Sequence, residues 1–180
     1  MKRIGLALVL MVLLASQAFG EGPTHDNVAI GFHHSSAPLG IRWWFNDSQS
    51  MAFDVGVGIT SNDEGDDSET DFTFDLGLPM VLKAWNRAHF LFRPGFMYES
   101  DAEVVAGGEV ERGSVISILA ELEAEVFVTD NFSASASHGF GIFIVDDPVP
   151  DGVESDSRTD FGTFGNNITE IGFHLYGLWE

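Results

Sequence analysis

The sequence predicts an all-β protein, an eight-stranded antiparallel up-and-down transmembrane β-barrel, on three observations. Two long segments, 116–128 and 132–144, alternate apolar residues with polar or small ones, so each strand has two unlike faces. No other segment has the pattern of a helix that would cover the apolar face. Tight turns and long polar connections also alternate along the chain. Such a sheet is stable if it closes with its apolar face toward lipid and its polar face inside.

The first twenty residues have the pattern of a secretory signal peptide. Lys2 and Arg3 are followed by an apolar run over 4–14, broken only by Gly5, and small residues stand at the cleavage spacing near Gly20. This run is too short to span a membrane as a helix. We therefore expect residues 1–20 to be cleaved and residues 21–180 to form the barrel domain. The alternative is a retained N-terminal anchor.

The chain is strongly acidic and has no cysteine. Its formal charge is −20, with 28 acidic and 8 basic residues. So acidic a protein would be repelled by phosphates, which excludes nucleic acid as a partner. The absence of cysteine is unusual for a small secreted soluble domain, but a barrel is closed by backbone hydrogen bonds and needs no disulfide.

The alternation places the strands in order. The eight predicted strands are 28–34, 39–45, 50–59, 72–83, 88–99, 114–128, 132–145 and 168–179. Tight turns are expected at 46–47, 84–87 and 129–131, and acidic or polar loops at 61–71, 100–113 and 146–166. Pro79 cannot donate to the ladder and predicts a bulge or an end of pairing. A barrel with both termini and its tight turns at one end has this order of connections.

Eight alternating strands after a signal peptide resemble the small outer-membrane barrels of the OmpA/OmpX type. The final strand, 170–179, is similar to the C-terminal signal that such proteins present to the barrel-insertion machinery. The resemblance is one of pattern and covers nearly the whole mature chain. It implies a place in the outer membrane of a Gram-negative cell, with outer-membrane lipid, lipopolysaccharide and the insertion machinery as partners.

Charged residues are predicted to meet inside the barrel, where there is room for side chains but no open channel. The inward set is Arg42, Asp54, Asp75, Arg93, Glu121, Glu123, Glu125, Glu170, His174 and Tyr176, with Lys83 near the lower rim. Buried charges must be paired or neutralised. The acids outnumber the bases, so some must reach water, bind protons or bind a cation. We interpret the set as a salt-bridged plug; the alternative is a proton or cation path along Glu121, Glu123 and Glu125.

Two clusters carry other chemistry. His34 and Ser36 have a spacing that acyl transfer could use if an acid orients the histidine, and His138 beside Ser137 is a weaker candidate. The resemblance adds that some eight-stranded barrels of this membrane are lipid-modifying enzymes. Asp63, Asp66 and Asp67 lie in a run of oxygen ligands of the kind that calcium favours, but without the spacing of a preformed loop. We expect a solvated acidic loop and no cofactor; divalent cations at the acidic loops are the alternative.

We therefore expect a non-enzymatic outer-membrane barrel with a structural or surface-interaction role and a plugged interior. Two alternatives stay open. One is a lipid-modifying hydrolase or acyltransferase that uses His34 and Ser36. The other is a soluble secreted barrel that binds an apolar ligand.

Overall fold

The computed structural model describes residues 27–32, 34–45, 49–64, 67–104, 110–147, 157–163 and 170–177, without the side chains of 62–69, 101–112 and 163. The expected signal peptide 1–20 lies outside this part of the chain. The strands are β1 (Val28–Phe32), β2 (Leu39–Trp44), β3 (Ala52–Glu64), β4 (Asp67–Gly77), β5 (Met80–Trp85), β6 (Ala88–Val104), β7 (Val110–Phe127), β8 (Phe132–Asp146), β9 (Ser157–Thr163) and β10 (Glu170–Tyr176). Within the described residues, no helix has the length and hydrophobicity needed to cross a membrane.

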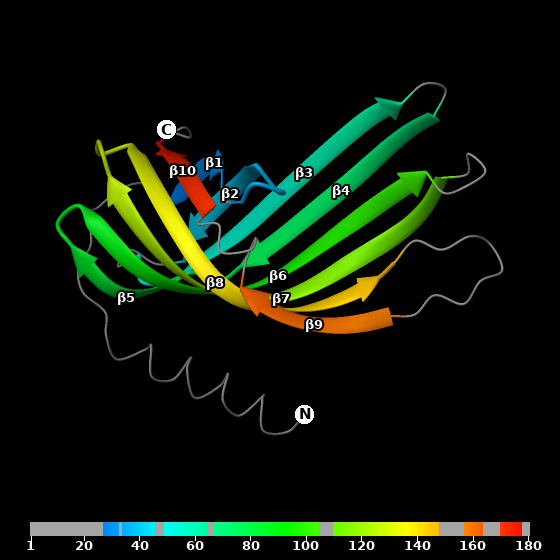
Figure 1. The fold of residues 1–180 in the computed structure, drawn as a ribbon. Helices are drawn as coiled ribbons and strands as arrows, with labels where there is room; N and C mark the ends of the chain where they lie inside the picture. Colours follow the sequence, from blue (N-terminus) through cyan, green and yellow to red (C-terminus); the bar gives the residue numbers. More distant parts are fainter. Residues whose placement is uncertain are drawn as a thin grey trace.

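The strands form one closed antiparallel barrel (Figure 1). Pairing runs from β1 through β2, β3, β4, β6 and β7 to β8, and β10 closes the ring by pairing with both β8 and β1. β4 and β5 both pair with β6 at successive heights, and β9 and β10 do the same along β8. Ten strands therefore occupy eight positions. The predicted closed barrel of eight strands is confirmed.

The strands extend beyond the predicted limits at one end. Residues 60–64 pair with 67–71, and residues 101–104 pair with 110–113. β9 lies inside the segment 146–166 that was predicted to be a loop. The loop predictions were wrong there because backbone pairing continues after the apolar alternation stops. Alternation reports a strand only where its two faces meet different surroundings. In Figure 1 the β3–β4 and β6–β7 hairpins project away from the closed part.

The break between β4 and β5 falls at Leu78 and Pro79, as the missing donor of Pro79 predicts. The pairing of β5 with β6 then shifts between Val81 and Lys83. Beyond this shift Lys83 lies opposite Phe90 and is exposed, although it was predicted to point inward. Met80, which precedes the shift and was predicted to point outward, is buried. Lys83 is therefore not part of the interior set.

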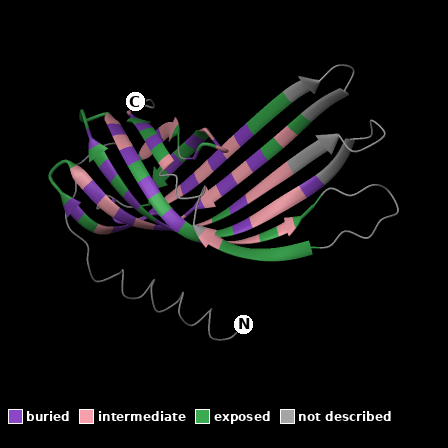
Figure 2. Cartoon of the chain, in the orientation of Figure 1, coloured by how far each residue is buried: buried purple, intermediate pink, exposed green. Residues whose placement is uncertain are grey.

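Elsewhere the predicted faces are confirmed. Along β7, Ile118, Leu122 and Val126 are about half exposed, whereas Glu121, Glu123 and Glu125 between them are buried. Figure 2 shows the same alternation of buried and exposed residues along β7, β8 and β10. Outside and inside are thus reversed relative to a soluble protein, because large apolar groups lie outside and ionisable groups inside.

The tight turns and the ends of the barrel chain lie together. The Trp44 amide donates to the Asn27 carbonyl at the start of β1, and the Tyr176 amide donates to the Asn131 carbonyl in the β7–β8 turn. The β5–β6 turn is also at this end, since the Phe127 amide donates to the Arg87 carbonyl. The prediction that the tight turns lie at the same end as the first and last strand ends is confirmed. The long hairpins therefore lie at the opposite end of the barrel.

Candidate functional site, the buried charge network

The barrel interior collects the charged residues of six strands. Each lies at an alternate, inward position, so the same two-residue period that exposes the apolar rows buries these groups. The structure places all ten predicted residues on the inner side: Arg42, Asp54, Asp75, Arg93, Glu121, Glu123, Glu125, His174 and Tyr176 are at most 4% exposed, and the Glu170 side chain is 11% exposed. Nine of them form one connected network, and Glu170 lies apart from it in the barrel mouth.

Arg42 forms ion pairs with residues on opposite sides of the barrel. Its Nε and Nη2 donate to the two carboxylate oxygens of Asp54 on β3, each at 2.9 Å. Its Nη1 and Nη2 donate to both oxygens of Glu123 on β7, at 3.0 and 2.9 Å. Three strands lie between β2 and β7 in either direction around the ring. Two bidentate pairs fix the planar guanidinium in both directions, a geometry that lysine could not reproduce.

Arg93 holds three carboxylates beside Arg42. Its Nε donates to Asp54 Oδ2 at 3.0 Å, its Nη1 donates to Glu121 Oε2 at 2.6 Å, and its Nη2 donates to Asp75. Asp54 therefore bridges the two arginines. The guanidinium lies directly over Gly77, where an added Cβ would be 2.2 Å from Nε. Gly77 is needed at this position because any side chain would occupy the space of the guanidinium.

Glu125 is the centre of a second cluster nearer the tight turns. Ser133 and Tyr176 donate to its Oε1 at 2.5 and 2.9 Å, and His174 Nδ1 lies 3.3 Å from the same oxygen. His89 Nδ1 is 3.8 Å from Oε2. Below this cluster an apolar floor closes the barrel, with buried residues that include Trp44, Leu91 and Phe127. His89 packs edge-on against the rings of both Trp44 and Phe127.

Sequence reasoning left His89, Ser133 and Ser137 out of the network. Ser137 donates to Glu121 Oε1 at 3.2 Å, and Ser133 and His89 contact Glu125. All three occupy the inward positions of their strands, so the alternation itself was the signal that could have included them. Their partners could not be predicted because they depend on the register between strands.

The network leaves almost no free space. The cavity between Arg42, Arg93, Glu121, Glu123 and His174 measures about 10 Å³, which is about the size of one water molecule. The five network carboxylates exceed the two arginines, and the contacts of His89 and His174 with Glu125 offer two further donors. This packing fits a salt-bridged plug. It offers neither the volume nor the apolar lining that an apolar ligand would need.

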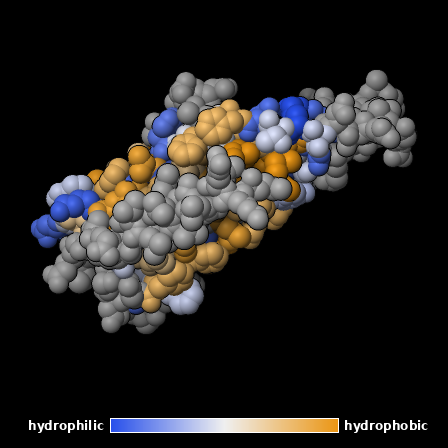
Figure 3. Space-filling model, turned by 90° about the horizontal axis from the view of Figure 1, so that it is seen from below, coloured by the Kyte–Doolittle hydropathy of each residue, from blue (hydrophilic) through white to orange (hydrophobic). Residues whose placement is uncertain are grey.

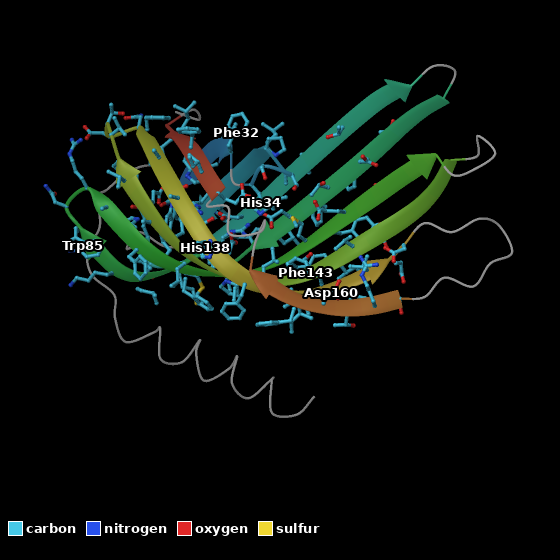
Figure 4. All side chains as sticks on the ribbon, in the orientation of Figure 1. Phe32, His34, Trp85, His138, Phe143 and Asp160 are labelled. Atoms are coloured by element: carbon cyan, nitrogen blue, oxygen red, sulfur yellow. The ribbon has the colours of Figure 1, made fainter. Side chains whose placement is uncertain are left out.

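The predicted pair His34 and Ser36 lies in the β1–β2 connection, which folds into the mouth of the barrel. Figure 4 shows His34 within the curve of the sheet, far from Trp85 at the tight-turn end. The His34 ring Nδ1 accepts from the Ser36 backbone amide at 3.5 Å, and Nε2 is 4.0 Å from Glu170 Oε1. This hydrogen bond uses the amide, so it does not draw the proton from the Ser36 hydroxyl as nucleophile activation requires.

The other sequence candidates are not brought together. His138 is exposed on the outer face of β8, whereas Ser137 points inward to Glu121. The side chains of Asp63 and Asp67, and all of Asp66, lie outside the described part of the structure. Among the residues that are described, no group of three or more histidine or acidic side chains could hold a metal ion.

Glycines let the β1–β2 connection enter the barrel mouth. A Cβ at Gly58 would lie 1.9 Å from the Ser36 carbonyl oxygen, and one at Gly56 would contact Ala37. Ala37 is fully buried as a result. On the other side, the amide and hydroxyl of Ser35 donate to Glu170 at 3.2 and 3.1 Å. The connection is therefore held between β3 and β10.

We expect Gly58→Val to displace this connection, because the new side chain would overlap the backbone at Ser36. Amide hydrogen exchange at residues 34–37 should become much faster, while exchange in the middle of β7 stays slow. Gly162→Ala is the matched control, since its Cβ would meet nothing closer than 3.9 Å. Equal exchange at 34–37 in both variants would contradict the packing of the β1–β2 connection on β3.

Comparison with protein-family models, with characterised proteins and with solved structures finds no match for this chain.

Proposed function

We propose that this protein is an outer-membrane β-barrel with a structural or surface-interaction role and a plugged interior. One observation carries the proposal: the wall presents large apolar side chains outward all round the closed part, while the interior holds the ionisable residues of the charge network. Leu39, Ile41 and Trp43 on β2, Ile118 and Leu122 on β7, and Phe173 and Leu175 on β10 are all more than 40% exposed. In Figure 3 hydrophobic residues cover much of the visible wall, and hydrophilic ones gather toward its ends. A soluble monomer rarely exposes so continuous an apolar surface.

The height of this surface supports the same proposal. Apolar outward positions on and just beyond β7 run from Ile116 to Val128, which is roughly 40 Å along the strand and roughly 30 Å along the barrel axis at the usual tilt. The outward apolar band of barrels in this membrane is about 25 Å tall. The wall is therefore tall enough to cross the hydrocarbon core.

The filled interior favours an anchoring or surface role over transport. The long hairpins β3–β4 and β6–β7 project from the end opposite the termini (Figure 1), where they would meet partners or the lipopolysaccharide layer and its divalent cations. Because the network closes the lumen, the purified protein should give no steady conductance in planar bilayers. Stable open-channel steps would contradict the plugged interior.

The membrane assignment is tested by fractionation and by heating. We expect the mature chain in the outer-membrane fraction, soluble only with detergent, and a changed gel mobility after boiling because the closed barrel resists detergent until it is heated. The soluble alternative predicts a periplasmic protein that needs no detergent. Recovery of the protein in the periplasmic extract without detergent would refute the membrane assignment.

A further inference from the structure

A histidine lies on the outer wall of the barrel at mid-height. His138 is exposed on the outer face of β8 and pairs with Leu122 on β7. Leu122 is the middle one of the apolar outward positions from Ile116 to Val128. Figure 4 shows His138 about midway along β8. The imidazole therefore lies near the centre of the surface that the proposed function places in lipid.

The His138 ring has no polar partner within the described part of the chain, where it makes no hydrogen bond, ion pair or ring contact. Its outward neighbours are Leu122 on β7 and Ala136 and Phe140 along β8, all of them apolar. A polar group that lacks a hydrogen bond in hydrocarbon is costly. The headgroups are roughly 15 Å from the midplane of the hydrocarbon core, which is farther than an imidazole reaches. The ring therefore needs a polar partner at its own height.

Lys83 is also ionisable and exposed on the outer wall, but its position differs from that of His138. It lies opposite Phe90, which pairs with Ala124, one step closer to the tight turns than Leu122. The long side chain of lysine can extend along an apolar surface and bring its ammonium group to the headgroups. Lys83 therefore needs no partner inside the wall, whereas His138 does.

The wall around His138 consists largely of small side chains. Ala124 pairs with Ala136 one step toward the tight turns, and Ala120 pairs with Phe140 one step toward the long hairpins. All four residues occupy outward positions. In membranes, small residues let the backbones of two packed helices approach closely, and small outward residues do the same for two barrel walls. A second wall can therefore come close enough to reach the imidazole.

A second copy of the chain supplies a matching group at the same height. Two copies inserted in the same direction can be related by a two-fold axis along the membrane normal, and such an axis brings the same patch of both copies together. Rotation about this axis keeps every residue at its height, so His138 meets the same residue of the second copy. A neutral imidazole has one donor and one acceptor nitrogen, so the two rings can share a hydrogen bond.

We propose that this surface, the β7–β8 patch (Ala120, Leu122, Ala124, Ala136 and His138), is the interface of a symmetric dimer in which the two His138 side chains hydrogen-bond to each other inside the bilayer. The inference rests on the proposed function, because an exposed histidine in water needs no protein partner. Lipid chains satisfy the apolar residues of the patch but offer the imidazole neither a donor nor an acceptor.

Cross-linking in the outer-membrane fraction tests the contact, because the chain has no cysteine of its own. Mild oxidation should link the His138→Cys variant into a species of twice the monomer mass that a reductant splits, since a disulfide needs Cβ atoms about 3.5–4.5 Å apart. Val55→Cys is the matched control and should stay monomeric. Val55 is an outward residue in the middle of β3, which lies four positions from β8 in either direction around the ring.

Sedimentation equilibrium of the purified protein in detergent micelles measures the strength of the dimer. We expect His138→Leu to raise the dissociation constant about 5- to 30-fold, the effect of a hydrogen bond between protein segments inside a membrane. His138→Gln should keep most of the affinity, because an amide also donates and accepts. Ala136→Phe should weaken the dimer while leaving His138 in place, because the larger ring holds the two walls apart.

Fractionation of the same cells separates failure of the dimer from failure of the membrane assignment, and the heat-dependent gel mobility shows that each variant is folded. Recovery of the protein in the periplasm would refute both. For a protein found in the outer membrane, three results would overturn the dimer alone. They are equal cross-linking of His138→Cys and Val55→Cys, a cross-linked species of some other mass, which would indicate a different protein partner, and an unaltered chain that is monomeric or dimerises no more tightly than His138→Leu.

Discussion

Replacing Arg93 by methionine is expected to lower the free energy of unfolding by about 3–5 kcal/mol, the usual cost of removing one partner from a buried ion pair. The change leaves Asp75 and Glu121 without their guanidinium, and Asp54 loses one of its two arginine partners. Urea titration of the protein in detergent micelles measures the loss. The triple variant Arg93→Met, Asp75→Asn, Glu121→Gln should recover much of it, because it removes two of the stranded charges.

Arg87→Met is the matched control for this change. Arg87 pairs with Asp130, but the two side chains are 57% and 86% exposed, and an exposed pair contributes about 0–1 kcal/mol. Equal losses for Arg87→Met and Arg93→Met would mean that the interior charges are hydrated and do not depend on one another.

Leu122→Arg is expected to cost about 2–4 kcal/mol in liposomes, whereas Val128→Arg should cost about 0–1 kcal/mol. The two residues share the outer face on and just beyond β7 and have similar exposure, 49% and 57%. They differ in height, because Leu122 lies mid-wall opposite Phe92 and His138 while Val128 lies beside the β7–β8 turn. In a bilayer the first arginine would meet hydrocarbon, and the second would reach the headgroups.

The comparison of Leu122→Arg with Val128→Arg distinguishes a barrel wall that faces lipid from one that faces water. In water both positions are open to solvent, so both arginines should be tolerated, and the difference in unfolding free energy between the variants should vanish. A difference below about 0.5 kcal/mol, the scatter of ordinary surface substitutions, would reject the orientation proposed for the wall.

The closed barrel and the facing of most strands could be predicted because one rule governs them, the two-residue period between unlike surroundings. Leu122 and Glu123 alternate in the sequence as they do in the wall. The two-residue period gives no signal where both faces of a strand meet the same surroundings. Residues 60–64 and 67–71 remain paired, but their polar composition gave no alternation and predicted a loop. Lys83 was assigned to the wrong face because the shift in β5 pairing, which comes before it, depends on the partner strand.

The interior set could be predicted as a group, but its contacts could not. The period buries Arg42 and Glu123, yet their pairing follows from their heights on opposite walls. The cavity of about 350 Å³ at the barrel mouth was missed for a related reason. Ser36, Asp71 and Glu99 belong to three segments that the sequence predicted as loops or strand ends, and only closure of the barrel brings them around one cavity.

Closure through β10 has a consequence for assembly. β10 must pair with β1, which lies near the other end of the chain, and with β8. The two seams therefore form only after the strands β2 to β9 have been made, and pairing over so long a sequence separation is slow. Until then β1 and β8 present open edges that can recruit strands of other chains. We expect refolding of the isolated protein to be slow and sensitive to its concentration, with aggregation competing against the final β1–β10 contact.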